Sequence, residues 1–256
     1  MNSNYIIALK SIWIKEISRF LRIWIQTLVP PVITMSLYFI IFGNLIGSRV
    51  GEMSGFSYMS FIVPGLIMMS VITNSYSNVA SSFYSAKFQR HVEELIVAPV
   101  PNHIIILGYI GGGVARGLMV GFLVTCVSLF FVELQIYNIL VLILSVIFTA
   151  ILFSIGGLLN AIFARTFDDI SIIPTFVLTP LTYLGGVFYS ISLLPEFWQG
   201  VSHFNPVFYM INAFRYGFLG IADVSLVWSF FVIVTFIVFF YGVVTLLLKK
   251  GVGIRT

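Results

Sequence analysis

The segment between two long apolar stretches, residues 86–103, holds the densest group of side chains that could make specific polar contacts. Its charged or titratable members are Lys87, Arg90, His91, Glu93 and Glu94. Its apolar members recur at the spacing of one helical face: Phe88, Val92, Leu95 and Ile96. A helix here would therefore be amphipathic. Such a helix fits either a membrane surface or the cleft of a partner protein.

No other set of residues has the spacing of a catalytic or metal site. The sequence has no G-x-S-x-G turn, no H-E-x-x-H pair and no Cys/His cluster. The three histidines are scattered, and the single cysteine, Cys126, lies in an apolar stretch. We expect neither catalysis nor a bound cofactor or metal. Nucleic-acid binding is not expected either, because no basic patch is interleaved with stacking aromatic residues.

A phosphate-binding G-x-x-x-x-G-K-[ST] loop is also missing from the sequence. If ATP drives this protein, we expect the ATP and its Mg²⁺ to bind to a separate chain.

One charge lies deep in an apolar stretch. Arg116 comes about 12 residues into the stretch that begins at Ile104, which is roughly 18 Å along a helix. A charge at that depth is costly against lipid and faces protein or water. It is either a functional group or a structural partner of carbonyls or a carboxylate. Glycines spaced by four residues surround it and indicate close helix packing, either within the chain or against a second subunit.

Six further polar positions could contribute to a site in the loops. Asp168 and Asp169 precede an apolar stretch, where carboxylates cap helix N–H groups, although a contact with a partner is the alternative. A second group lies in the aromatic, Gly- and Pro-rich segment 190–225, and its members could gate or receive a substrate: Glu196, His203, Asn205 and Arg215. Local charge pairing is the simpler interpretation of this group.

The elements that position these residues are membrane helices. The chain of 256 residues is 59% hydrophobic and only 9% charged, with a mean hydropathy of +1.08, whereas soluble domains carry about 25% charged residues. A spanning helix needs about 20 apolar residues. Six stretches qualify: Ile23–Ile46, Tyr58–Tyr84, Ile104–Val132, Ile139–Ala164, Ile170–Tyr189 and Leu226–Leu248. The sequence therefore predicts a single all-α transmembrane domain over residues 1–256.

The distribution of basic residues predicts the orientation. Ten Lys and Arg residues flank the spans on one side, and two, Arg49 and Arg215, lie on the other. This asymmetry places both termini and residues 86–103 in the cytoplasm. Residues 1–22 read as an interfacial helix on the cytoplasmic leaflet, or as the bent start of the first span. Residues 190–225 read as two short re-entrant helices in the outer leaflet, broken near Asn205-Pro206.

Three stretches resemble the membrane subunits of ABC-2 type transporters, and the likeness covers nearly the whole chain. They are VEELIVAPVPNHIIILGYIGGGVARG (residues 92–117), FARTFDDISIIPTFVLTPLTYLGGVFYS (residues 163–190) and NPVFYMINAFRYGFLG (residues 205–220). The chain looks most similar to small permeases of the bacterial inner membrane that are encoded beside a separate ATPase.

The resemblance implies an assembly and a role for several segments. Two six-helix permeases pair, and two ATPase subunits dock beneath them. Residues 1–22 become a connector helix, and residues 190–225 become outer helices that close the exit. The helix between the second and third spans becomes the coupling helix, which inserts into the ATPase; its contact residues would be Phe88, Arg90, His91, Val92, Glu93, Glu94 and Leu95.

These expectations favour the permease subunit of an ATP-driven exporter, with a hydrophobic or amphiphilic substrate. The alternatives are an ion-coupled secondary transporter or channel, and more remotely an intramembrane enzyme. The former should show several carboxylates at mid-membrane depth or repeat symmetry, and the latter a buried Ser/His pair. A neighbouring gene with a phosphate-binding loop would separate the first interpretation from the second.

Overall fold

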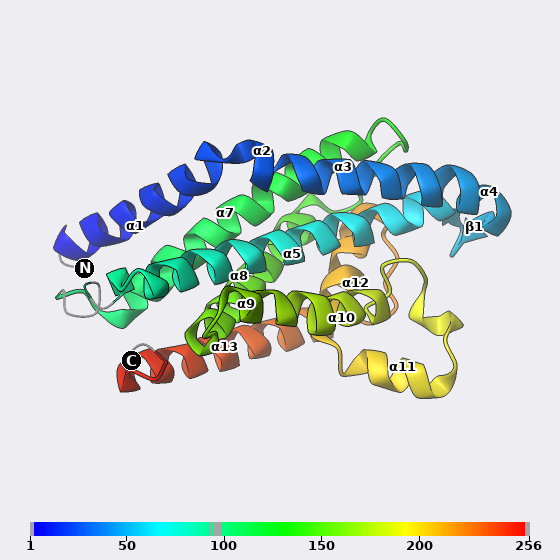
Figure 1. The fold of residues 1–256 in the computed structure, drawn as a ribbon. Coiled ribbons are helices and arrows are strands. Elements are labelled where there is room, and N and C mark those ends of the chain that lie inside the picture. The colour runs from blue at the N-terminus through cyan, green and yellow to red at the C-terminus, as the bar shows by residue number, and fades with distance from the viewer. Residues whose placement is uncertain (1–2, 93, 95–98, 254–256) are drawn as a thin grey trace.

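The computed structural model describes residues 3–92, 94 and 99–253, and most of them are helical (Figure 1). The elements in chain order are α1 (Ser3–Arg22), α2 (Trp24–Thr27), α3 (Val29–Tyr38), η1 (Phe39–Ile46), α4 (Gly47–Val50), β1 (Glu52–Met53), β2 (Phe56–Ser57), α5 (Tyr58–Phe88), α7 (Asn102–Ser128), α8 (Ile139–Phe163), α9 (Phe167–Ile173), η2 (Pro174–Leu178), α10 (Thr179–Leu184), η3 (Ile191–Leu193), α11 (Glu196–His203), α12 (Pro206–Leu219) and α13 (Leu226–Lys250). The strands β1 and β2 form one short antiparallel hairpin.

The two ends of the helix bundle differ. Both termini, the α5–α7 connection and the α8–α9 loop lie at one end, which we call the terminal end (Figure 1). The hairpin and α11 lie at the other, which we call the far end. The basic residues of α1, of the last turn of α5 and of the last turn of α13 gather at the terminal end.

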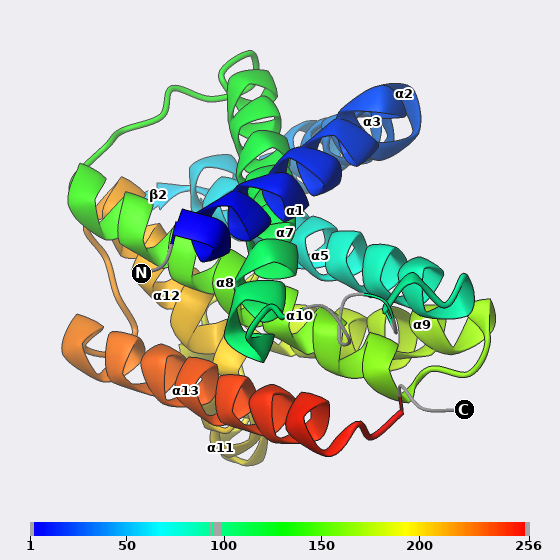
Figure 2. The same cartoon turned by 90° about the vertical axis from the view of Figure 1, so that its left-hand side faces the viewer.

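Helix α5 lies at the centre of the bundle and packs against α7 and α8, while α1 lies across α7 (Figure 2). Most residues of α5 are buried, although the C-terminal half of this helix is rich in Ser and Asn. The outer helices α3 and α13 leave large apolar side chains exposed, among them Leu37, Phe231 and Phe239. This is the surface expected of helices that face lipid.

Five helical runs of the described chain are long and apolar enough to cross a membrane, and they coincide with five of the six predicted spans. They are Trp24–Val50, Tyr58–Phe88, Asn102–Ser128, Ile139–Phe163 and Leu226–Lys250. The remaining prediction, Ile170–Tyr189, is divided into α9, η2 and α10. Pro174 and Pro180 have no N–H to donate, so the run widens into a π-helix between them.

The N-terminal region forms a separate helix before the first span, and its place at the membrane surface stays a prediction. Helix α1 is separated from the first span by a break at Ile23, whose φ is −111° and ψ 37°. It therefore forms an element of its own, joined end to end with the first span through a bend (Figure 1). One side of α1 packs on α7 through Ile12 and Phe20, and apolar residues such as Ile6 and Ile14 stay exposed on another side.

The predicted coupling helix is shorter than residues 86–103. Helix α5 continues through Phe88, and the chain then turns at Gln89 and Arg90, where Arg90 adopts a positive φ of 62°. At the other side, Asn102 and His103 already belong to α7. Phe88 therefore does not share a helical face with Val92, as its spacing had suggested, because the left-handed residue between them interrupts the helix.

Candidate functional site

A buried polar stripe runs along the C-terminal half of α5. Its members recur every four residues and so share one face of the helix: Ser70, Asn74, Asn78 and Ser82. Buried polar groups need partners, since an unpaired one costs about 1–3 kcal/mol. Asn78 and Ser82 find partners on α1 and Asn74 finds one on α7, whereas Ser70 bonds within α5. The contacts with α1 and α7 form two charged clusters.

The first cluster joins α1 to the stripe through a carboxylate. Glu16 is fully buried, and its Oε1 accepts a hydrogen bond of 2.7 Å from the Ser82 hydroxyl. Its Oε2 lies 3.5 Å from Nη2 of Arg19. Arg19 in turn donates to Oδ1 of Asn78 at 2.8 Å and to the Asn78 carbonyl at 3.0 Å. A charge pair therefore fixes α1 against the central helix.

The glycines of α7 make room for this docking. A Cβ atom at Gly108 would lie 2.5 Å from Ile12, one at Gly111 2.2 Å from Trp13 and one at Gly112 2.5 Å from Glu16. The Trp13 indole also donates to the carbonyl of Leu107 at 3.0 Å. The glycine spacing found in the sequence thus serves packing within the chain, which was the simpler of its two interpretations.

The second cluster surrounds Arg116. Its Nη2 donates to Oδ1 of Asn74 at 3.0 Å and to the carbonyl of Thr27 at 3.3 Å. Its Nε is buried and has no partner in the described part of the chain. The guanidinium borders a cavity of about 350 Å³ between α3 and α5, lined by Gln26, Thr34, Tyr38, Ser70, Thr73, Asn74 and Ser77 among others. A cation thus borders a partly polar cavity, also lined by Pro30, Pro31, Met35 and Met69, that opens to the outside of the bundle.

At the terminal end, two side chains of α5 hold the loop between α8 and α9. Nζ of Lys87 donates to the carbonyls of Ile162 at 2.7 Å and Ala164 at 2.8 Å, which terminates α8 with a positive charge. The Tyr84 hydroxyl donates to the Arg165 carbonyl at 2.7 Å. The ring of Phe167 lies 4.8 Å from that of Tyr84. We call these contacts the α5–α8 clamp.

The structure describes five of the seven predicted coupling residues. Phe88 is exposed at the end of α5, with its ring 5.4 Å from that of Phe167. Arg90, His91 and Glu94 are exposed, whereas Val92 is buried in the hydrophobic core. Of the two apolar members that the structure describes, only Val92 is therefore buried, and the predicted common apolar face with Phe88 is not formed. The other two, Glu93 and Leu95, lie outside the described residues.

The paired aspartates lie beside the clamp. Thr166 is the N-cap of α9, and Asp169 completes a capping box by accepting from the backbone N–H groups of Arg165 at 2.8 Å and Thr166 at 3.0 Å. These two N–H groups hold the pKa of the Asp169 carboxyl below its ordinary value. The sequence placed the cap at the aspartates themselves, whereas the threonine before them supplies it. Asp168 is exposed in the same turn.

The far-end candidates do not form one cluster. Arg215 is buried, 3.8 Å from Asp223 and 4.0 Å from the centre of the Phe61 ring, and it donates to the Gly186 carbonyl. Asn205 caps α12 and donates to the Leu181 carbonyl at 2.6 Å. Glu196 and His203 are exposed on α11. Arg215 and Asn205 thus connect α12 to the region around α10, and a gating role for any of the four stays a prediction.

Sequence reasoning missed Glu16 and the α5 stripe as components of the site. Both had a signal: the four-residue spacing of the Ser and Asn residues, and a lone carboxylate three residues before Arg19 in a basic helix. Asp223 was missed as well, because nothing in its sequence neighbourhood points to Arg215.

Comparison with known proteins gives a consistent result. A family model described as ABC-2 type transporter matches residues 7–219. The chain is 70% identical over 252 residues to the inner membrane transport permease YadH of Escherichia coli K12, covering 98% of each protein. It is 25% identical over 217 residues to nodulation protein J of Rhizobium leguminosarum bv. viciae, covering 82% of each. Nodulation protein J of Rhizobium meliloti is 20% identical over 211 residues.

Proposed function

Because this chain belongs to the ABC-2 type transporter family, we propose that it is the membrane subunit of an exporter powered by a separate ABC ATPase. Membership of the family makes it a membrane permease that pairs with an ABC ATPase, and the comparisons together with its apolar helices make it a multi-pass inner-membrane protein. We propose a hydrophobic or amphiphilic substrate, moved outward. The chain would perform no covalent chemistry, and ATP and Mg²⁺ would bind to the partner.

The assembly that we propose contains two copies of this permease and two ATPase subunits. The α9–η2–α10 run would be the fifth of six spans, and the terminal end would face the cytoplasm. The concentration of basic residues at the terminal end supports this orientation. Helices α11 and α12 would then lie at the outer face, near the substrate exit.

The observation that carries the proposal is the charged surface at the terminal end. Arg90, His91 and Glu94 are exposed there, and the α5–α8 clamp joins the same surface to Asp168 and Asp169. Two segments far apart in the sequence thus form one surface on which an ATPase could dock. Because the clamp fixes α5 to the start of α9, force applied at this surface would reach two spans together.

Charge reversal at this surface tests the proposal. In Glu94→Lys combined with Arg90→Glu, we expect substrate-stimulated ATP hydrolysis by the reconstituted complex to fall about tenfold, equivalent to about 1.4 kcal/mol of lost coupling. Membrane insertion should be unchanged, since both side chains are exposed. Glu133→Lys, an exposed carboxylate in the α7–α8 loop, is the matched control. Normal ATPase binding and normal transport in the double variant would mean that residues 86–103 only lie at the membrane surface and do not contact the ATPase.

Arg116 is the candidate for substrate contact inside the membrane. We expect Arg116→Leu to reduce transport about tenfold, about 1.4 kcal/mol, while the protein still inserts, because the cation at the polar cavity is lost. Arg116→Lys should retain part of the activity by keeping the charge. Initial transport rates in vesicles with equal amounts of inserted protein give the comparison. Full transport by Arg116→Leu would mean that the guanidinium only bonds Asn74 and the Thr27 carbonyl.

A further inference from the structure

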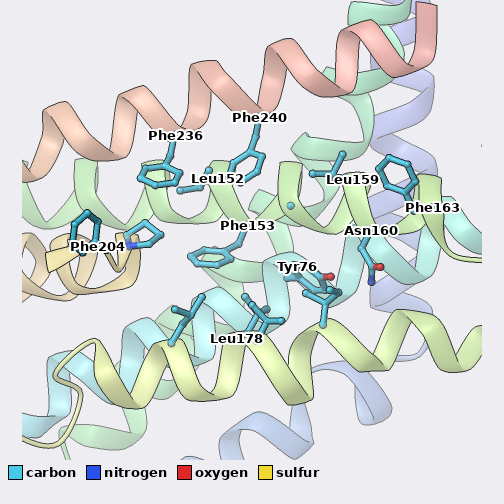
Figure 3. A pocket seen from close by; sticks show the side chains of 15 residues that line it. Tyr76, Leu152, Phe153, Leu159, Asn160, Phe163, Leu178, Phe204, Phe236 and Phe240 are labelled. Carbon is cyan, nitrogen blue, oxygen red and sulfur yellow. The ribbon is translucent and has the colours of Figure 1, made fainter. Parts of the chain in front are cut away.

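An apolar groove of about 510 Å³ lies between α8, η2–α10 and α13, away from the polar cavity of Arg116 (Figure 3). Its walls include Leu152, Phe153, Leu159, Leu178, Phe236 and Phe240. An apolar cavity of about 150 Å³ already binds benzene, and pockets of roughly 300–1,000 Å³ hold small molecules. The groove is therefore large enough for a ligand longer than a single ring.

The groove is elongated along the helices. On α8 it extends from Leu152 to Phe163, which is about 17 Å of helix. That is roughly half of the ~30 Å hydrocarbon core of a bilayer. Its Phe163 end lies at the last residue of α8, where the terminal end of the bundle begins. The length and position correspond to one alkyl chain of the leaflet at the terminal end.

Two polar side chains interrupt the apolar lining at that end. Tyr76 is only 2% exposed, and its hydroxyl makes no hydrogen bond of normal geometry among the described residues, although the Asn160 side chain comes close enough to interact with it. Asn160 lies beside it in the groove, one turn before the end of α8, as Figure 3 shows. A buried hydroxyl without a partner is costly, so a ligand atom that accepts its hydrogen bond would be stabilised there. The opposite end, at Phe204 and Pro206, is apolar.

We propose that this groove binds one acyl chain of a membrane phospholipid, with an ester or headgroup oxygen at the Tyr76 hydroxyl and the chain directed toward Phe204. The occupant comes from the bilayer, because the groove is bordered by α13, which also exposes Phe239 and Val238 on its surface. The site depends only on insertion into the membrane and is independent of the direction of transport. The bound acyl chain fills the space between α10 and α13 and can exchange with other lipids of the bilayer.

Photolabelling tests the site. The probe is a phosphatidylethanolamine with a diazirine on its acyl chain, incorporated into vesicles that hold the full permease–ATPase complex. We expect labelling of the groove residue Phe240 to exceed that of the exposed Phe239 on the same helix. Equal labelling of the two would show ordinary bilayer contact and overturn the proposal. A third outcome also overturns the proposal. If Phe240 is not labelled by the phospholipid and two copies of the permease crosslink through position 240 instead, a second permease covers the groove.

Filling the groove provides a second readout. A Cβ at Gly156 would lie an ordinary 3.7 Å from the Tyr76 ring, so Gly156→Leu should fold and direct its side chain into the groove. We expect it to reduce labelling at Phe240 at least tenfold, about 1.4 kcal/mol. Gly242→Leu on α13 is the matched control, because nothing lies within 4 Å of a Cβ there. Unchanged labelling in folded Gly156→Leu would exclude the groove as the binding place.

Removal of the hydroxyl tests the polar end separately. Tyr76→Phe keeps the ring, and we expect it to weaken phospholipid labelling about fivefold, about 1 kcal/mol for one hydrogen bond. Labelling by a diazirine alkane without a polar group should not change. Tyr109→Phe is the control, since Tyr109 is also buried with an unpartnered hydroxyl in the described chain but does not line the groove. Equal losses in both variants would assign the effect to general destabilisation.

Discussion

Replacing Glu16 with alanine is expected to detach helix α1 from the bundle. The carboxylate is fully buried, and its loss leaves the Ser82 hydroxyl without its acceptor and Arg19 without its counter-charge, although Arg19 keeps its hydrogen bonds to Asn78. Removing one partner of a buried charge pair costs about 3–5 kcal/mol. We expect the lower end, about 3 kcal/mol, because the Arg19 side chain is still 30% exposed and solvent compensates part of the loss.

Two measurements check this expectation. The free energy of unfolding in mixed micelles should fall, and trypsin should cleave after Lys15 and Arg19 faster than in the unchanged protein. Glu16→Gln retains an acceptor for Ser82, so its free energy of unfolding and its cleavage rate should lie between those of Glu16→Ala and the unchanged protein. Lys15→Ala is the control, since Lys15 is 52% exposed and lies 3.9 Å from Glu16, so its contribution is small. Unaltered stability of Glu16→Ala would mean that α1 docks through its apolar residues alone.

Substituting alanine at Gly157 is expected to destabilise the fold by about 3 kcal/mol, the upper part of the range for overpacked cores. A Cβ at this position would lie 2.3 Å from the Tyr76 carbonyl oxygen and 3.2 Å from the backbone nitrogen of Ala80. These are main-chain atoms of α5, so no side chain can rotate away to relieve the clash. The helices α5 and α8 would have to separate.

The neighbouring glycine supplies the control. A Cβ at Gly156 meets only the Tyr76 ring at 3.7 Å, so Gly156→Ala should be nearly neutral. Unfolding in micelles and the yield of monodisperse protein should distinguish the two variants clearly. Similar behaviour of both would contradict the close backbone approach of α5 and α8.

The sequence predicts the features that follow from apolar length and periodicity. Five of the predicted spans coincide with helices, and the break near Asn205-Pro206 lies between α11 and α12. Such features depend on local composition, which a sequence displays directly. The predicted start of the coupling helix failed because Arg90 adopts a left-handed conformation, and nothing in its residue type requires that.

The site was harder to predict because it is assembled from distant segments. Glu16 and Ser82 meet across two helices, and Arg215 finds Asp223 only once α12 has folded back. Arg116 was singled out because a deep charge is conspicuous, yet its partner Asn74 was hidden among other polar residues. Spacing shows which residues share a face, but which two faces meet depends on the packing of the bundle.

The α5–α8 clamp has a consequence for how motion would pass through the molecule. Lys87 and Tyr84 are bonded to the end of α8 and the loop that follows it, so we expect α5 and the first turn of α9 to move together. Beyond α9, the chain enters η2, which begins at Pro174 and is followed by Pro180 in α10, and neither proline can donate a hydrogen bond to the helix ladder. We therefore expect η2 to act as a hinge in the α9–η2–α10 run. Force applied at the terminal end of the bundle would then tilt α10 toward or away from its neighbours at the far end.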